Sequence, residues 1–176
     1  MKAIVRSGDY FRVFKPGWSD PLDPSYSLER GGRWNAPHTF GVLYLNATYA
    51  VAAANARRRH AGRAIGLFDL KPDRRPHLLT LDVPRSLALD VVTDAGIAAL
   101  DLPANYPWRV AHARCRPIGK NAYAQRRLRG IACRSAAECT ATDWIGEELA
   151  WFDRSPLLVE RSRRSFEQWY PDPHPA

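Results

Sequence analysis

Short apolar runs, interrupted by turn-forming residues, are the main pattern along the chain, and they predict β-strands. The run Val42–Leu45 is almost wholly apolar, which is typical of a buried strand. Similar runs predict further strands over residues 10–14, 65–70, 78–83, 131–133, 149–152 and 156–160. The turn-forming residues 71–73 would join two of these strands into a hairpin. A large β component is therefore expected.

Alanine-rich and amphipathic stretches predict helices between these strands. Thr48 is a suitable cap for a helix that runs to about His60, and Arg57–Arg59 lie near its C-terminal end, where the helix dipole favours cations. Shorter helices are expected over residues 94–101, 106–116 and 119–129, the last ending at Gly130. The whole pattern predicts a single α+β domain over residues 1–176, with its core at about 10–160 and an extended tail at 170–176.

Composition narrows the setting in which such a domain would work. The chain has 176 residues, of which 45% are hydrophobic, enough to build one buried core. It has no apolar run of about 18 residues and no secretory signal, so we expect a soluble, cytoplasmic protein with no membrane contact. The three cysteines lack metal-like spacing, and we expect reduced thiols and no metal site.

The net charge of +8 leaves two interpretations open. The basic residues either bind a phosphate-bearing ligand or nucleic acid, or they form a solvated basic surface. Two basic runs, at residues 57–59 and 126–129, favour a nucleic-acid-binding domain as an alternative. Neither run has interleaved aromatic residues, which weakens that alternative.

Two sequence blocks carry a resemblance to a known family. Gly31-Gly32-Arg33-Trp34-Asn35-Ala36-Pro37, followed by Gly41-Val42-Leu43-Tyr44-Leu45, is similar to the opening block of the RES-domain family. Pro117-Ile118-Gly119 and then Gly130-Ile131-Ala132-Cys133-Arg134-Ser135-Ala136 resemble its second block, and Phe11-Arg12-Val13 resembles an early aromatic–arginine pair. The resemblance covers roughly residues 10–160.

This resemblance implies a fold, an activity and a partner. The fold would be related to the ADP-ribosyltransferases, with a mixed β core flanked by helices. The activity would be cleavage of NAD⁺ at its nicotinamide–ribose bond, by hydrolysis, phosphorolysis or transfer of ADP-ribose to a protein. Members usually act as toxins of bacterial toxin–antitoxin pairs, so the implied partner is a small DNA-binding, Xre-like antitoxin, and nucleic acid would be met only through it.

The resemblance also assigns site residues. Arg12 and Arg33 match the family arginines, Tyr44 matches its site tyrosine, and Ser135 matches its named serine. The family glutamate lies eleven residues after the tyrosine, and Asn55 occupies that position here. The resemblance therefore implies that Arg33, Tyr44, Asn55 and Ser135 form the catalytic site.

The residue chemistry agrees with this assignment and keeps simpler interpretations open. Arginine forks suit the two phosphates of NAD⁺, and two glycines before Arg33 allow close approach of a ligand. Tyr44 could stack on nicotinamide, or it could be a core aromatic residue with a satisfied hydroxyl. Ser135 could hold an amide or a ribose, or cap the next segment. Trp34 and Asn35 are included as ligand-binding neighbours, although core packing and a turn are the commoner roles of such residues.

Asn55 raises the main question about catalysis. A carboxylate stabilises the positive charge that develops on the ribose carbon as nicotinamide leaves, and losing such an element costs about 10²–10³ in rate. Glu138, Glu147 and Glu148 could substitute, although each alone is more typical of a solvated surface acid. The sequence thus predicts an NAD⁺-cleaving enzyme, with a catalytically weakened NAD⁺-binding module as the alternative.

Overall fold

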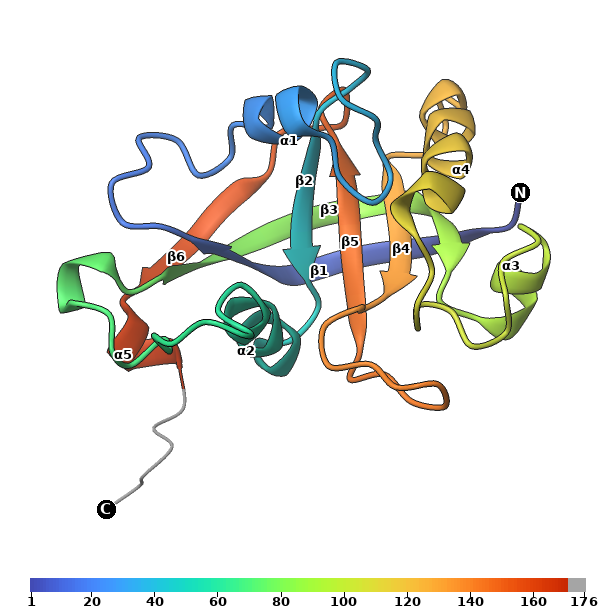
Figure 1. The fold of residues 1–176 in the computed structure, drawn as a ribbon. Coiled ribbons are helices and arrows are strands. Elements are labelled where there is room, and N and C mark those ends of the chain that lie inside the picture. The colour runs from blue at the N-terminus through green and yellow to red at the C-terminus, as the bar shows by residue number, and fades with distance from the viewer. Residues whose placement is uncertain (171–176) are drawn as a thin grey trace.

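Six strands form a single sheet in residues 1–170, the part of the chain that the computed structural model describes (Figure 1). The predicted tail falls mainly on residues 171–176, which lie outside the described residues. The strands are β1 (Ala3–Phe14), β2 (Val42–Asn46), β3 (His77–Val91), β4 (Gly130–Arg134), β5 (Glu147–Phe152) and β6 (Val159–Arg164).

Five of these strands close into a barrel-like ring. The order is β1-β2-β5-β4-β3-β6, and an additional pairing of β1 with β3 completes the ring and leaves β6 outside it. Strands β3 and β4 run parallel, whereas the other pairs are antiparallel. The expected α+β class with a mixed β core and flanking helices is confirmed.

Helices cover this ring at several places (Figure 1). They are α1 (Ser25–Arg30), α2 (Tyr49–Arg58), α3 (Asp94–Ala98), α4 (His112–Ala124) and α5 (Phe166–Trp169), with a short 3₁₀ turn η1 (Pro72–Arg74). Helix α2 begins as predicted, because the Thr48 hydroxyl accepts a hydrogen bond of 3.2 Å from the Val51 amide. Its buried alanines let it pack closely against β1 and β2.

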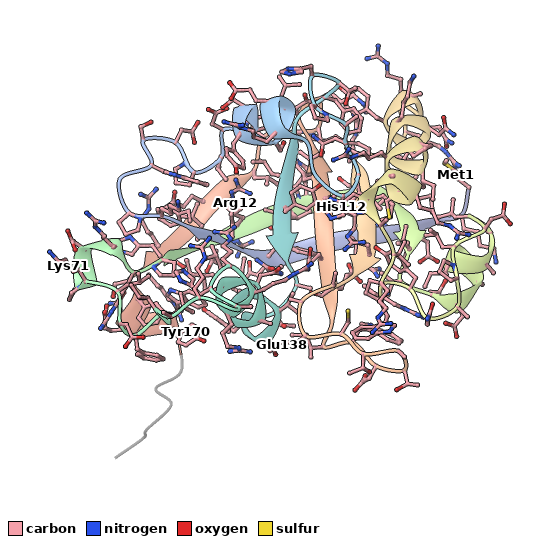
Figure 2. All side chains as sticks on the ribbon, viewed as in Figure 1. Met1, Arg12, Lys71, His112, Glu138 and Tyr170 are labelled. Carbon is pink, nitrogen blue, oxygen red and sulfur yellow. The ribbon has the colours of Figure 1, made fainter. Side chains whose placement is uncertain are left out.

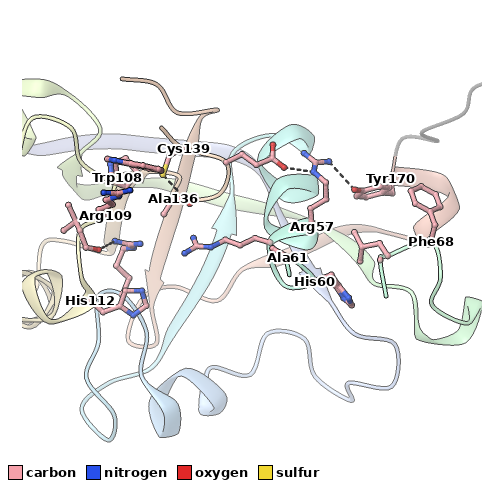
Figure 3. A pocket seen from close by; sticks show the side chains of 17 residues that line it. Arg57, His60, Ala61, Phe68, Trp108, Arg109, His112, Ala136, Cys139 and Tyr170 are labelled. Atoms are coloured by element: carbon pink, nitrogen blue, oxygen red, sulfur yellow. Dashed lines mark hydrogen bonds and ion pairs between the residues drawn. The ribbon is translucent and has the colours of Figure 1, made fainter. Parts of the chain in front are cut away.

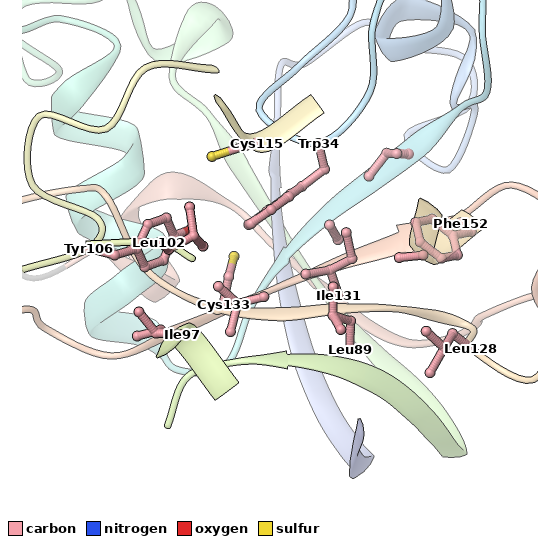
Figure 4. Packing of buried hydrophobic residues seen from close by; sticks show 14 of the residues in the cluster. Trp34, Leu89, Ile97, Leu102, Tyr106, Cys115, Leu128, Ile131, Cys133 and Phe152 are labelled. Atoms are coloured by element: carbon pink, nitrogen blue, oxygen red, sulfur yellow. The ribbon is translucent and has the colours of Figure 1, made fainter. Parts of the chain in front are cut away.

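The largest hydrophobic cluster fills the space between the sheet and α4 (Figure 4). Trp34 and Tyr106 belong to this cluster, together with apolar residues of β4 and β5 such as Ile131 and Phe152. Gly119 brings α4 against the backbone of Trp34, where any side chain would collide with the Trp34 carbonyl. This contact fixes the loop that follows Gly31 against the core.

Several predicted elements differ from the observed ones. Residues 65–70 do not form a strand, because β3, their predicted partner, is already paired with β1, β4 and β6. The helices predicted at 106–116 and 119–129 are replaced by turns up to 110 and then by α4, which continues through Pro117. The first strand begins at Ala3 rather than residue 10, since its early half pairs with the end of β3.

The remaining differences between the predicted and observed elements are smaller. The closing strand predicted at 156–160 is β6, which begins at Val159 and runs to Arg164. Helices α1 and α5 lie in segments for which the sequence predicted no helix. No helix within residues 1–170 has the length and apolar character needed to cross a membrane.

Candidate functional site

Tyr44 connects the middle of β2 to the glycine-rich loop at residues 31–35. Its hydroxyl donates to Oδ1 of Asn35 at 3.2 Å and accepts from the backbone amide of Trp34 at 3.3 Å. A Cβ atom at Gly32 would collide with this hydroxyl, which explains why glycine stands there. Burial raises the pKa of Tyr44, so its phenol is neutral at physiological pH.

Trp34 and Asn35 hold this loop in place rather than facing the cavity. Both are fully buried. Nδ2 of Asn35 donates to the carbonyl of Ser27 at 2.6 Å and to that of Phe40 at 2.9 Å. These two residues, predicted as ligand neighbours, therefore contact the core and the backbone of the loop.

Arg33 lies between these two residues and the open cavity. Its Nη1 donates to the carbonyl of Val110 at 3.1 Å and approaches the sulfur of Cys115 at 4.0 Å. Its Nε and Nη2 donate to no other group of residues 1–170. Arg33 therefore keeps part of its guanidinium available for a ligand.

Arg12 is engaged differently. Its Nε donates to the carbonyl of Pro21 at 2.6 Å, and its Nη1 donates to the carbonyl of Tyr44 at 3.3 Å. Burial, with a smaller contribution from the positive charge of Arg59, lowers the pKa of Arg12 to about 10. Arg12 does not line the cavity, and its visible role is to hold β2 against the chain that follows β1.

Asn55 and Ser135 both donate a hydrogen bond to the carboxylate of Glu148, which the sequence did not distinguish from Glu138 and Glu147. Oε1 of Glu148 accepts hydrogen bonds from Oγ of Ser135 at 2.6 Å and from Nδ2 of Asn55 at 2.9 Å. Nδ2 of Asn55 also donates to Oδ1 of Asn46 at 2.8 Å. Residues that are 93 positions apart in sequence are thus joined across α2, β4 and β5.

A cavity of about 1050 Å³ opens beside these residues (Figure 3). One wall comes from residues 107–112 and the other from the end of α2 and residues 60–68. Arg33 and Ala136, the neighbour of Ser135, contribute to its lining. The charged and titratable residues of the lining are Arg33, Arg57, Arg58, Arg109, His60, His112, Glu138, Cys139 and Tyr170.

The lining carries an excess of positive charge. Nε of Arg57 pairs with Oε1 of Glu138 at 2.5 Å, and Nη1 of Arg57 donates to the hydroxyl of Tyr170 at 3.2 Å. Burial and the nearby charges of Arg33, Arg116 and Arg58 lower the pKa of His112. Because Glu138 offsets a single arginine, the cavity remains suited to an anionic ligand.

The cavity residues come from distant parts of the chain, as Figure 2 shows for His112 at the start of α4, Glu138 after β4 and Tyr170 after α5. Sequence reasoning missed Arg109 and His112 as site residues and took Arg57–Arg59 for a helix end or a basic run. The one signal in the sequence that could have found any of these residues was the position of Arg57 and Arg58 at the end of α2. Of the predicted site residues, Arg33 alone lines the cavity.

Within residues 1–170 no three His, Cys, Asp or Glu side chains are grouped as a metal site would require. The fold and the site together define a mixed α+β domain with an arginine-lined cavity beside the loop of residues 31–35.

The RES-domain family model matches residues 9–171, and the chain belongs to this family. No curated protein gave a significant sequence match. By structure, the chain is similar to the MbcT toxin in the crystal structure of the M. tuberculosis MbcT–MbcA toxin–antitoxin complex. The two share 20% sequence identity with a TM-score of 0.76, covering 93% of this chain and 86% of the other. At this identity the likeness establishes the fold.

Proposed function

We propose that this RES-domain protein binds NAD⁺ in the arginine-lined cavity and cleaves its nicotinamide–ribose bond. The observation that carries the proposal is the cavity itself. It has about 1050 Å³ of space, an unneutralised arginine excess, and Arg33 and Ala136 of the two family blocks in its lining. This volume lies at the upper end of the range for small-molecule sites, as a dinucleotide requires.

The charges of NAD⁺ match the two sides of this site. Its pyrophosphate is suited to the guanidinium groups of Arg33, Arg58 and Arg109, which can donate paired, charge-assisted hydrogen bonds. Its nicotinamide ring is positively charged and would be oriented away from the arginines. The ribose would lie toward Ala136 of the lining, beside which Ser135 and Asn55 donate hydrogen bonds to Glu148.

The product acceptor and the biological role are part of the same proposal. Water, phosphate or a protein side chain would take the ADP-ribose. The similarity to MbcT supports a role as the toxin of a toxin–antitoxin pair. The cognate partner would be the Xre-like antitoxin that the family resemblance implies. Expression of the chain alone in a bacterial host should then lower cellular NAD⁺ and arrest growth, and co-expression of a cognate antitoxin should restore both.

Asn55 favours one alternative, a module that binds NAD⁺ but turns it over slowly. Asn55 occupies the position at which the family resemblance places the acid, and an amide carries no charge. The nucleic-acid alternative is less well supported. Arg57 and Arg58 line the cavity instead of a continuous basic strip, and Arg57 is already paired.

The direct test incubates the purified protein with NAD⁺ and measures free nicotinamide by chromatography, with ADP-ribose binding measured by calorimetry. Arg33→Ala should weaken ADP-ribose binding by about 10- to 100-fold, since hydrogen bonds to charged groups contribute about 1.5–3 kcal/mol. Arg85→Ala is the matched control, because Arg85 is exposed on β3 and outside the cavity.

The possible outcomes separate the proposals. Nicotinamide release that depends on Arg33 supports the enzyme. ADP-ribose binding without nicotinamide release supports the weakened module. If neither binding nor release occurs, or if Arg33→Ala changes neither, the assignment of the cavity to NAD⁺ is wrong.

A further inference from the structure

The pairing of the strands decides which way Glu148 points. Glu148 of β5 is paired with Asn46 of β2 on one side and with Cys133 of β4 on the other. Tyr44 is paired with Ala150, two residues further along β5. Because side chains alternate along a strand, Glu148 projects from the same face of the sheet as Tyr44.

The adjacent acid, Glu147, projects from the opposite face and is neutralised there. Its carboxylate accepts two hydrogen bonds of 2.6 Å from the guanidinium of Arg6. Glu138, the third acid in this part of the chain, is paired with Arg57. By contrast, no Arg, Lys or His side chain of residues 1–170 lies within 4.0 Å of the Glu148 carboxylate. Glu148 is thus the one of these three acids whose negative charge is not offset within residues 1–170.

The hydrogen bonds of Glu148 fix one oxygen and leave the other open. Oε1 accepts from both Ser135 and Asn55. Oε2 accepts no hydrogen bond from residues 1–170, and it is not among the buried atoms without a partner, so solvent reaches it. Burial mainly, and the charge of Glu148 in addition, raise the pKa of Tyr44. The carboxylate is therefore oriented through Oε1 and accessible through Oε2, next to the predicted site residues Ser135 and Asn55.

Such a carboxylate has a defined use in the proposed reaction. The bond between the ribose carbon and the nicotinamide nitrogen breaks, and its electron pair leaves with neutral nicotinamide. The positive charge passes to the ribose ring, and water then adds to the carbon and releases a proton. A fixed negative charge near that carbon stabilises the transition state.

We propose that Glu148, presented from β5, supplies the carboxylate that helix α2 lacks at Asn55. Asn55 and Ser135 are positioning residues that hold Oε1 while Oε2 faces the ribose. This inference rests on the proposed cleavage of NAD⁺. It assigns the acid of the site to a strand, at a position 93 residues beyond the one that the family resemblance indicates.

Glu148→Gln tests the charge with little change of shape. We expect nicotinamide release to fall by about 10²–10³-fold, as for loss of one electrostatic element, with the Kd for ADP-ribose nearly unchanged. Glu147→Gln is the matched control, because it alters the adjacent acid on the opposite face. It should leave the rate of nicotinamide release near that of the wild type.

Moving the carboxylate provides a second, independent variant. In the double variant Asn55→Glu/Glu148→Gln, the acid returns to α2 while an amide takes its place on β5. We expect this variant to recover a measurable part of the rate lost in Glu148→Gln. Asn55→Glu alone brings two carboxylates within hydrogen-bonding distance, which raises the pKa of one of them and adds a new transition to the pH–rate profile.

The outcomes distinguish this inference from the function on which it rests. If the wild type releases nicotinamide and Glu148→Gln does so equally fast, the role of Glu148 is wrong and the proposed function stands. The same conclusion follows if Glu147→Gln loses as much activity as Glu148→Gln while remaining folded. If the wild type releases no nicotinamide, the proposed function fails and this inference fails with it.

Discussion

The hydroxyl of Ser135 donates a hydrogen bond of 2.6 Å to Oε1 of Glu148, joining the residue after β4 to the start of β5. The same oxygen of Ser135 accepts a hydrogen bond of 3.2 Å from the amide of Ala137. Ser135 thus orients a carboxylate and shapes the turn that leads to the cavity lining. A contact of this kind predicts an effect on the rate of reaction more than on substrate binding.

Ser135→Ala should lower kcat for nicotinamide release by about ten- to a hundredfold and leave KM nearly unchanged. The reason is that a hydrogen bond to a charged group is worth about 1.5–3 kcal/mol, of which each 1.4 kcal/mol is tenfold in rate. Steady-state kinetics of both parameters is the measurement. Ser155→Ala is the control, since the Ser155 hydroxyl donates to the carbonyl of Arg129 away from the cavity. A rise in KM at constant kcat would contradict the positioning role.

Gly32→Ala should lower the free energy of unfolding by about 1–3 kcal/mol, the usual cost of overpacking. Its Cβ would collide with the hydroxyl of Tyr44 and lie 2.9 Å from Oδ1 of Asn35. Chemical denaturation measures the loss. Adding Tyr44→Phe removes the colliding oxygen, so the double variant should be more stable than the sum of the two single effects predicts. Simple additivity would show that the collision is relieved elsewhere.

His112 should gain protons when an anionic ligand enters the cavity. Burial and the charges of Arg33, Arg116 and Arg58 lower its pKa in the free protein, and a bound pyrophosphate would offset those charges and raise it. Binding of ADP-ribose should therefore become tighter as the pH falls through the range in which His112 titrates. NMR titration of the histidine ring with and without ADP-ribose is the measurement. The signals of His38, which lies outside the cavity, should not respond to the ligand.

Tyr106→Phe should raise the free energy of unfolding by about 1 kcal/mol. The hydroxyl of Tyr106 is buried without a hydrogen-bond partner in residues 1–170, and such a group costs about 1–3 kcal/mol. Tyr10→Phe provides the contrast, because the hydroxyl of Tyr10 donates to Glu147 at 3.2 Å and its removal should be destabilising. Thermal and chemical unfolding of both variants tests the pair. Destabilisation by Tyr106→Phe would point to an undetected partner of its hydroxyl.

The elements that the sequence predicted well are those fixed by local interactions. Helix α2 begins at its Thr48 cap and buries its alanines, and the apolar runs at Val42 and Ile131 form β2 and β4. The segment at 65–70 failed because its apolar residues lack a free strand to pair with. Pro117 lies inside α4, where the sequence predicted a break between two helices.

The residues of the candidate site also differ in whether the sequence alone could indicate them. Arg33, Tyr44, Asn55 and Ser135 could be predicted as site residues because they lie in two contiguous blocks or at a fixed spacing from them, and of the four Arg33 lines the cavity. Glu148 could not be separated from Glu147, since two consecutive strand residues face opposite sides and the register with β2 and β4 decides between them. Arg109 and His112 reach the cavity through the packing of residues 107–112, which no local pattern encodes.

The closed ring of strands also bears on when the protein becomes active during its synthesis. The pairings that close the ring between β2 and β4 both involve β5, and Glu148 follows Arg33, Tyr44, Asn55 and Ser135 in the chain. A nascent chain that lacks β5 has neither a complete barrel nor the proposed carboxylate. The proposed cleavage of NAD⁺ would therefore begin only after this late strand has left the ribosome and joined its neighbours.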